Sequence, residues 1–378
     1  MSEELKSFRD TFKRWIEKEI IPFHEEWEKA GMVPRELYKK AGEQGFLCPL
    51  VKEEYGGLGL DYHFSAVITE ELSFAMVSGV AFWLHSDIIV PYIEHYGNET
   101  QKQKYLPGCV SGDYVTAVAM TEPGTGSDLQ GISTKAVLEG DHWVLNGAKT
   151  FISNGHVANL YVVVAETPAK DPNQKFKSLS LFLVEENDVG FERGRKLQKI
   201  GLKAQDTAEL AFVNCRIPKD RLLGEEGKGF IYLSNELAQE RLGVAIMSQA
   251  MAEKCVEITA DYVKGRKAFK KRIADFQNTR FKLAECATEV KVGRAFVDRL
   301  IEIHAKEKCS TVEASMAKTW CSEMFCRVAD ECLQLHGGYG YMWEYTIARA
   351  YADARVQRIY AGTNEIMKEI IARDLLDK

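Results

Sequence analysis

About one third of the way along its length, the chain reads Ala119-Met-Thr-Glu-Pro-Gly-Thr-Gly-Ser-Asp128. Pro123-Gly124 predicts a turn, because proline presets φ and glycine tolerates positive φ. Gly124 and Gly126 let the backbone approach a ligand closely and point N–H groups at it. The apolar run Tyr114–Met120 predicts a strand that ends at this turn. We therefore expect a cofactor-binding loop; for the loop taken alone, an ordinary surface turn is an equal alternative. It matches neither the P-loop nor the GxGxxG fingerprint.

Four further motifs follow along the chain: Phe151-Ile-Ser-Asn-Gly155, Gln239-Glu-Arg241, Gln334-Leu-His-Gly-Gly-Tyr-Gly340 and Ile359-Tyr-Ala-Gly-Thr-Asn-Glu-Ile366. With the glycine-rich loop, and in this order and spacing, they resemble the acyl-CoA dehydrogenase family of flavoproteins. The resemblance covers essentially the whole chain, and the long-chain type is the most similar.

The composition is that of a globular protein, with 378 residues of which 46% are hydrophobic and 28% charged. A net charge of −6 and the lack of a Lys/Arg block argue against a nucleic-acid partner. No apolar run reaches the length of a membrane span, and the first residues lack a signal-peptide pattern. Nine scattered cysteines without a CxxC pair predict reduced thiols and no metal site. We expect a cytoplasmic protein, or a mitochondrial matrix protein if this is a processed eukaryotic form.

The N-terminal region, expected over residues 1–116, has a helical pattern. Apolar residues from Leu5 to Ile16 recur at spacings of three and four, which predicts one amphipathic helix. A second helix is expected after Pro34 and a third over about Ser65 to Glu94, with Glu54–Gly59 as a loop between them.

The middle region, expected over residues 117–226, is rich in short β-type runs. The predicted strands are Thr134–Leu138, Trp143–Leu145, Leu160–Ala165, Leu179–Val184 and Leu210–Val213. Glu139-Gly-Asp141 and Asn146-Gly147 indicate hairpin turns, and residues 170–175 a polar loop. Together they predict a small β-barrel or sandwich.

Long helical patterns return in residues 227–378. The predicted helices are Gly229–Gly265, Phe276–Lys306, Val312–Leu335 and a last one ending at Leu376. The fold class is therefore α+β and multidomain. An all-α N-terminal domain, a middle β-barrel or sandwich domain and a C-terminal four-helix-bundle-like domain match the layout that the resemblance implies.

The resemblance implies α,β-dehydrogenation of an acyl-CoA thioester, in which a base removes the α-proton while the β-hydrogen leaves as hydride to the flavin N5. In many family members the base is a Glu directly before the Gly-Thr of the last motif, where this chain has Ala361. Either the chain is a non-catalytic relative, or the carboxylate comes from elsewhere. The long-chain and isovaleryl types place it on a helix, directly before an arginine, and Glu240 matches that pattern.

Glu240 is therefore the predicted base. A Glu on a helix is more often solvated and paired with Lys or Arg. Its neighbours in Leu237–Gly243 are mostly apolar or small, as in a helix that lines a buried pocket. If Glu240 is buried beside an apolar acyl chain, its pKa should rise.

Two donors would polarise the thioester carbonyl: the backbone N–H of Ala361 and, by resemblance, a ribityl hydroxyl of FAD. A backbone donor does not depend on the side chain, so Ala361 can keep this role without a carboxylate.

By resemblance, one subunit contributes two segments to the FAD site: Val118, Ala119, Met120, Thr121, Glu122, Pro123, Gly124, Thr125, Gly126 and Ser127, and then Phe151, Ile152 and Ser153. Thr121 would bond the isoalloxazine edge, Ser127 would reach toward the pyrophosphate and the substrate, and Phe151 would form an aromatic wall. Taken alone, Phe151 is more typical of a strand core and Ser153 of a turn.

A second set is implied to act on the flavin of a neighbouring subunit: Arg266, Phe269, Gln277, Gln334, Leu335, His336, Gly337 and Gly338. Arg266 would pair with the pyrophosphate. The family usually has Gly after that Phe, whereas this chain has Lys270. Thr363, Asn364 and Glu365 open the last helix, whose N-terminus can face the flavin.

The implied substrate path is lined by Ser127, Ala238, Gln239, Glu240, Arg241, Ala361 and Gly362. Arg241 would approach the CoA end, and the small Ala361 and Gly362 would leave room for branched chains. His85 and His336 are expected to be packed or capping residues.

The sequence thus predicts an FAD-dependent acyl-CoA dehydrogenase of fatty-acid β-oxidation with a long-chain-like preference. Its expected partners are the acyl-CoA substrate, an electron-transfer flavoprotein as electron acceptor and, because the flavin site is shared, three further copies in a homotetramer built as a dimer of dimers. Two alternatives stay open: a short- or branched-chain dehydrogenase of isovaleryl type, and a non-catalytic flavin- or CoA-binding relative.

Overall fold

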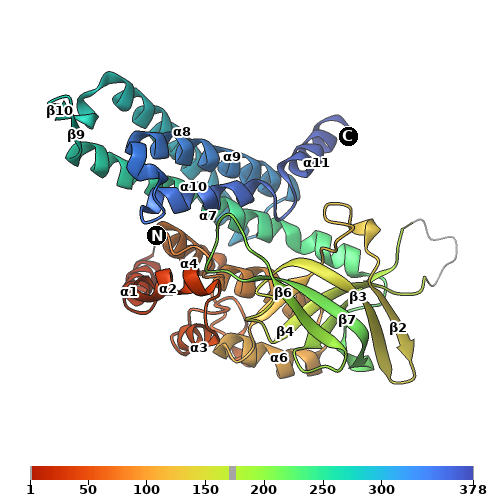
Figure 1. The fold of residues 1–378 in the computed structure, drawn as a ribbon. Coiled ribbons are helices and arrows are strands. Elements are labelled where there is room, and N and C mark those ends of the chain that lie inside the picture. The colour runs from red at the N-terminus through yellow and green to blue at the C-terminus, as the bar shows by residue number, and fades with distance from the viewer. Residues whose placement is uncertain (1, 170–175, 378) are drawn as a thin grey trace.

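The computed structural model describes residues 2–169 and 176–377, so the loop expected at 170–175 lies outside the described residues. Helices, then a β-sheet, then long helices follow one another along the chain (Figure 1). The expected fold class, with helical N- and C-terminal parts around a middle sheet, is confirmed. Within the described residues, no helix combines the length and the apolar character that a membrane span requires.

The N-terminal helices are α1 (Glu3–Glu19), α2 (Ile21–Ala30), α3 (Arg35–Glu43), α4 (Tyr62–Phe74), α5 (Val90–Tyr96) and α6 (Glu99–Ser111). The continuous helix expected over Ser65–Glu94 is wrong. Helix α4 ends at Phe74, and the chain bends through Gly79 (φ +94°) before a π-helical turn over Leu84–Ile89 leads into α5. A Cβ at Gly79 would lie 2.4 Å from the Gln205 backbone nitrogen, so this bend lets the chain approach the middle region closely.

The middle region forms an eight-stranded sheet in the order β6-β7-β3-β2-β4-β5-β8, with β1 paired in parallel to β4. The strands are β1 (Thr116–Ala119), β2 (Lys135–Glu139), β3 (His142–Ser153), β4 (Leu160–Glu166), β5 (Leu179–Glu185), β6 (Phe191–Lys196), β7 (Thr207–Pro218) and β8 (Leu222–Leu223). The parallel β1–β4 pair lies inside the sheet and delivers the glycine-rich loop from a buried strand.

The hairpin turn expected at Asn146-Gly147 is wrong, because β3 runs through both residues as one strand. The strand shifts register there against β7, and the extra residue is absorbed as a bulge. The Asn214 N–H donates to Asn146 Oδ1 at 2.8 Å, which ties the bulge to the neighbouring strand.

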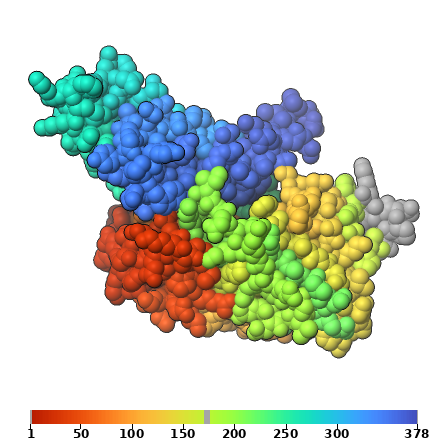
Figure 2. Space-filling view, in the orientation of Figure 1, coloured from red at the N-terminus to blue at the C-terminus, as the bar shows by residue number. Residues whose placement is uncertain are grey.

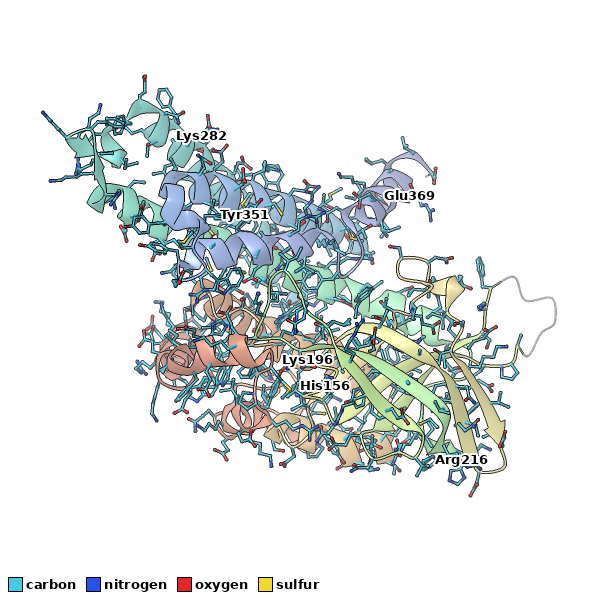
Figure 3. All side chains as sticks on the ribbon, in the orientation of Figure 1. His156, Lys196, Arg216, Lys282, Tyr351 and Glu369 are labelled. Atoms are coloured by element: carbon cyan, nitrogen blue, oxygen red, sulfur yellow. The ribbon has the colours of Figure 1, made fainter. Side chains whose placement is uncertain are left out.

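The C-terminal region contains α7 (Gly229–Gly265), the short hairpin β9 (Lys267–Ala268) and β10 (Lys271–Arg272), α8 (Gln277–His304), α9 (Thr311–His336), α10 (Thr346–Ala354) and α11 (Asn364–Leu376). Helix α7 has 37 residues and is therefore about 55 Å long at about 1.5 Å per residue. It starts beside the sheet and ends at the β9–β10 hairpin, on the opposite side of the molecule (Figure 1). Figure 3 labels Arg216 of β7 at the lower end of the sheet and Lys282 of α8 toward the hairpin end of the molecule.

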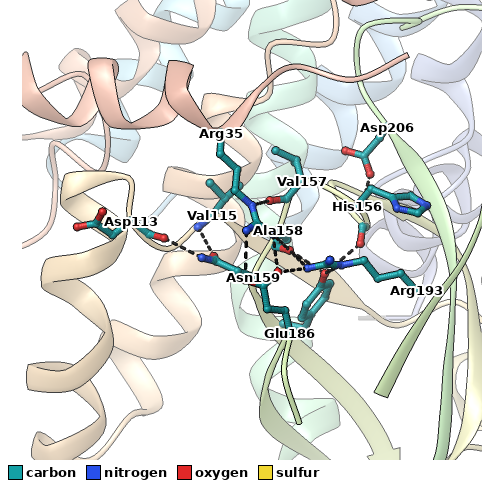
Figure 4. A network of polar contacts seen from close by, with 12 residues as sticks. Arg35, Asp113, Val115, His156, Val157, Ala158, Asn159, Glu186, Arg193 and Asp206 are labelled. Carbon is teal, nitrogen blue, oxygen red and sulfur yellow. Dashed lines mark hydrogen bonds and ion pairs between the residues drawn. The ribbon is translucent and has the colours of Figure 1, made fainter. Parts of the chain in front are cut away.

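The three regions are joined by polar contacts as well as by packing. Arg35 of α3 donates to the Val157 carbonyl at 2.6 Å and pairs with Glu186 at 2.7 Å (Figure 4). Arg193 of β6 binds the same carboxylate and the Ala158 carbonyl. The segment after β6 reaches the C-terminal helices (Figure 2), where the Leu202 N–H donates to Asp353 of α10.

Candidate active site

The glycine-rich loop folds back on itself between β1 and β2. The N–H groups of Glu122 and Thr125 donate to each other's carbonyls at 2.9 and 3.1 Å, which closes the expected turn over Pro123-Gly124. A Cβ built on Gly124 or Gly126 would meet nothing within 4 Å. Open space therefore lies directly above the backbone at both glycines, as binding of a flat or phosphate-bearing ligand by backbone N–H groups requires.

An interior ion pair fixes this loop. Lys149 of β3 is 0% exposed at its side chain and Glu122 is 3% exposed, and they pair at 2.8 Å. Glu122 also accepts from the Ser133 N–H and Oγ at 2.7 and 2.6 Å, and from the Thr134 N–H at 2.9 Å. Lys149 additionally donates to the Met120 carbonyl at 3.1 Å. The Glu122 carboxylate thus points inward and holds the loop, so its side chain is turned away from a cofactor.

Phe151 projects from a second irregularity in β3. The register against β7 shifts between Lys149 and Ile152, and Phe151 has a φ of +59°. A bulky residue with positive φ is strained and persists only where its surroundings enforce it. The phenyl ring is 67% exposed, so it stands on the surface and is not part of the sheet core. The strand-core alternative for Phe151 is therefore wrong, and its role as an aromatic wall stays a prediction.

Glu240 lies on α7, and its side chain is half-buried. Its Oε2 is shielded from solvent and has no hydrogen-bond partner among the described residues. Burial raises the pKa of Glu240 to about 7, although the nearby positive charges of Arg241 and Lys318 oppose that rise. A carboxylate with an unused oxygen and a pKa near neutrality is suited to accept a proton.

The Ala361-Gly362 turn precedes α11 and has positive φ at both residues, +55° and +87°. Thr363 caps α11 by accepting from the Ile366 N–H at 3.4 Å. The Gly362 carbonyl accepts from Lys318 Nζ of α9 at 2.8 Å. Arg241 lies on the same side of α7 as this turn, because a Cβ on Gly362 would lie 3.8 Å from its Nη2. Because the charge of the same Lys318 acts on Glu240, the candidate base and the candidate carbonyl donor share one neighbourhood.

Arg241 is buried at 3% exposure, and its nearest polar partner is Ser315 Oγ at 3.4 Å. Its Nε has no partner in the described part of the chain. The guanidinium therefore lies inside the C-terminal helices, packed between α7 and α9.

The second implied set lies at the far end of α7. Arg266 is exposed beside the Tyr339 ring, and Phe269 is 89% exposed on the β9–β10 hairpin. A groove of about 700 Å³ is lined there by Arg266 and Gln334–Gly338, together with other residues of α7 and the 337–342 segment. Phe269 and Lys270 both adopt positive φ, so this hairpin forms its turn without the glycine that the family usually has. Gln277 is exposed at the start of α8.

These two sets are separated along one rigid helix. Glu240 and Arg266 lie about 40 Å apart along α7, at about 1.5 Å per residue. One ligand molecule cannot contact both Glu240 and Arg266 of the same chain across this distance. The structure brings together Glu240 with the Ala361-Gly362 turn, and separately Arg266 with Gln334–Gly338; that these are two halves of one shared site stays a prediction.

Several predicted side chains are directed into the protein core. Ala119 and Ile152 belong to the buried sheet core, and Asn364 is fully buried with hydrogen bonds to Ser322, Glu323 and Lys318. His336 is buried and stacks on Tyr262 with ring centroids 4.1 Å apart, in line with the packed role expected for it. His85 is buried as well, and it bonds Thr116 and the Cys109 carbonyl. Such residues can act on a ligand through the backbone or by shaping the site.

Two buried lysines were missed from the sequence, Lys149 and Lys318. Lys318 stands in phase with Ala314, Cys321 and Phe325, which are all buried on one face of α9. A lysine inside such an apolar stripe is the signal that identifies it.

Comparison with known proteins identifies related chains. The family model described as acyl-CoA dehydrogenase, N-terminal domain, matches residues 2–113; the middle-domain model matches residues 117–215 and the C-terminal-domain model residues 227–376. The solved structure of an acyl-CoA dehydrogenase from Geobacillus kaustophilus has a TM-score of 0.96 and 55% identity, and the match covers 100% of this chain and 99% of that one.

Two curated relatives differ in the substrate that they are named for. The mitochondrial long-chain specific acyl-CoA dehydrogenase of Sus scrofa is 51% identical over 375 residues, 99% of this chain and 87% of the relative. The mitochondrial isobutyryl-CoA dehydrogenase of Dictyostelium discoideum is 37% identical over 378 residues, 99% of this chain and 90% of the relative.

Proposed function

The chain belongs to the acyl-CoA dehydrogenase family, and we propose that it oxidises long-chain acyl-CoA thioesters with Glu240 as the catalytic base. Members of this family are FAD-dependent enzymes, and this chain is one of them.

The observation that carries the assignment of the base is the unpartnered Oε2 of Glu240. Since this oxygen is shielded from solvent and bonded to no described group, it is free to take the α-proton of a bound thioester. The pKa of about 7 makes the carboxylate a stronger base than an exposed Glu and keeps it substantially ionised at neutral pH. Ala361 supports the relocation, because the usual base position holds no carboxylate.

The residues fit FAD at both half-sites. The open backbone at Gly124 and Gly126 and the exposed Phe151 would hold the isoalloxazine end. Arg266, Phe269 and the glycines Gly337 and Gly338 would hold the pyrophosphate and adenosine of a neighbour's cofactor. Bound FAD supplies the acceptor for the β-hydride. The protein's own residues orient the acyl chain, take up the α-proton at Glu240 and donate the Ala361 N–H to the thioester oxygen.

The preference for long chains is supported by the 51% identity to the Sus scrofa long-chain enzyme. A short- or branched-chain preference is the alternative. The small side chains at Ala361 and Gly362 support this alternative. So does the 37% identity to the Dictyostelium relative that is named for isobutyryl-CoA.

A homotetramer, a dimer of dimers, is the proposed assembly; it is supported by the separation of about 40 Å along α7 between Glu240 and the groove at Arg266, which a neighbouring copy would bridge. An electron-transfer flavoprotein is the proposed electron acceptor. We place the protein in the cytoplasm, or in the mitochondrial matrix if the chain is a processed eukaryotic form.

The test is an anaerobic titration of the FAD-loaded protein with acyl-CoAs of increasing length, followed by flavin absorbance, for the wild type and Glu240→Gln. We expect bleaching with long-chain thioesters in the wild type. Glu240→Gln should still bind FAD and acyl-CoA but lose at least about 10³-fold in the rate of bleaching, at the upper part of the range for a general base. More than a few per cent of residual rate would contradict the assignment of the base. Binding without bleaching in the wild type would favour a non-catalytic relative.

A further inference from the structure

Lys318 is a buried cation that the reaction described above does not use. It lies on α9 and is 0% exposed. Its Nζ donates to the Gly362 carbonyl and to Asn364 Oδ1, both at 2.8 Å. Among the described residues, no carboxylate lies within ion-pair distance of Nζ, and both acceptors are neutral amide oxygens. Burying a charge without a close counter-ion costs free energy, which makes Lys318 a candidate for a specific role.

The acceptor of Lys318 belongs to a strained turn. Ala361 has a φ of +55°, a conformation that residues with a Cβ rarely adopt, and Gly362 follows at +87°. In the described part of the chain, the bond from Lys318 is the one side-chain hydrogen bond that this turn receives. Asn364, two residues after Gly362, donates from its side-chain amide to Ser322 Oγ. Lys318 thus fixes the turn and the start of α11 together.

The charge of Lys318 also acts on Glu240. Arg241 and Lys318 both face the Glu240 carboxylate, and their positive charges oppose the rise of its pKa. The charged groups that face Lys318 are Arg241 and Glu240 of α7, Glu323 of α9 and Glu365 of α11. Burial, and next the charge of Arg241, lower the pKa of Lys318 to about 8.

We propose that Lys318 is a positioning residue that holds the Ala361-Gly362 turn with its N–H toward the thioester oxygen and places a positive charge near Glu240. This inference rests on the proposed function. Lys318 neither contacts the reacting atoms nor belongs to any of the five motifs. Its bond to the Gly362 carbonyl keeps the strained turn in one conformation, although the turn lacks the Glu side chain found in many relatives.

The first test compares Lys318→Met with the wild type as FAD-loaded enzymes, by the pH dependence of kcat/KM. Loss of a charge-assisted hydrogen bond should lower kcat roughly 10- to 100-fold. Without the nearby cation the pKa of Glu240 rises, so the acid limb of the profile should move to higher pH. Lys318→Gln restores a neutral donor without charge; it should recover part of kcat and keep the shifted limb. Lys306→Met, at an exposed position after α8, is the control and should leave both unchanged.

The second test needs no turnover. Calorimetry measures binding of an enoyl-CoA, which carries the thioester carbonyl, and of an S-alkyl-CoA thioether, which lacks it. Lys318→Met should weaken the enoyl-CoA roughly tenfold and leave the thioether within about twofold, since only the carbonyl contacts the turn.

Equal weakening of both CoA ligands would overturn the proposal because it indicates a general loss of structure. An unmoved acid limb would overturn it because the charge of Lys318 then does not act on Glu240. Unchanged kcat would overturn it because the turn then does not depend on Lys318. Failure of the proposed function is separable from these outcomes: it appears as an active Glu240→Gln enzyme, or as a wild type that no acyl-CoA reduces.

Discussion

Replacing Lys149 by methionine should loosen the glycine-rich loop and release FAD. The change removes one partner of a fully interior ion pair and leaves the Glu122 carboxylate with only its bonds to Ser133 and Thr134. Breaking such a pair typically destabilises a protein by about 3–5 kcal/mol, because one buried charge is left uncompensated. If about half of this appears as disorder of the loop, the Kd for FAD rises by at least about tenfold, at about 1.4 kcal/mol for each factor of ten.

The assay is titration of the apoprotein with FAD, followed by flavin fluorescence, with urea unfolding measured in parallel. The double variant Glu122→Gln/Lys149→Met removes both charges, so it should bind FAD better than Lys149→Met alone. Arg216→Met is the control, since its ion pair with Glu139 in the same sheet is exposed and contributes about 0–1 kcal/mol.

A wild-type Kd and wild-type unfolding in Lys149→Met would refute the reasoning. A double variant whose loss of FAD affinity equals the sum of the losses in the two single variants would refute it as well.

The Lys149–Glu122 ion pair also predicts how stability depends on pH. Burial alone would raise the pKa of Glu122, but the hydrogen bonds from Lys149, Ser133 and Thr134 outweigh it and lower the pKa to about 2. The stabilisation is therefore complete above about pH 4.5 and is lost as the pH falls toward 2.

Two further predictions concern the half-sites. The proposed base Glu240 must be ionised to act, and its pKa is about 7, so kcat/KM should fall about tenfold per pH unit below 7; a flat profile down to pH 5 would exclude it as the base. Mixed oligomers of Glu240→Gln and Arg266→Ala protomers should regain activity that neither variant shows alone, because some sites then combine an intact Glu240 with a neighbour's intact Arg266. Denaturation and co-refolding of the two variants followed by a dye-reduction assay measures this, and no recovery would mean that each chain completes its own site.

The family and the layout were predictable because the motifs are local and ordered along the chain. The glycine-rich turn, the capping Thr363 and the long helices all follow from short-range patterns of glycine, proline and apolar residues. The assignment of Glu240 as the base stays a prediction that the unpartnered oxygen and the raised pKa support.

The features that were missed depend on distant parts of the chain. Nothing near Lys149 or Lys318 in sequence shows that Glu122 or the Gly362 carbonyl will meet it. Asn146-Gly147 has the local signature of a hairpin, yet pairing with β7 holds it inside one strand. The break near Gly79 likewise follows from contact with the 204–205 backbone, and the apolar run Val80–Val90 looks continuous with α4 in sequence alone.

A single hydrophobic cluster runs through all three regions. It contains Phe12 and Ile93 from the N-terminal helices, Leu160 and Leu181 from the sheet, and Phe325 from α9. Each region therefore supplies a wall of the others' interior, and an isolated middle region would expose the apolar side that β4 and β5 turn toward the helices. We therefore expect unfolding of one region to destabilise the other two. A chimera that takes one region from a relative should therefore keep that relative's substrate specificity only if the matching side chains of this shared cluster are exchanged as well.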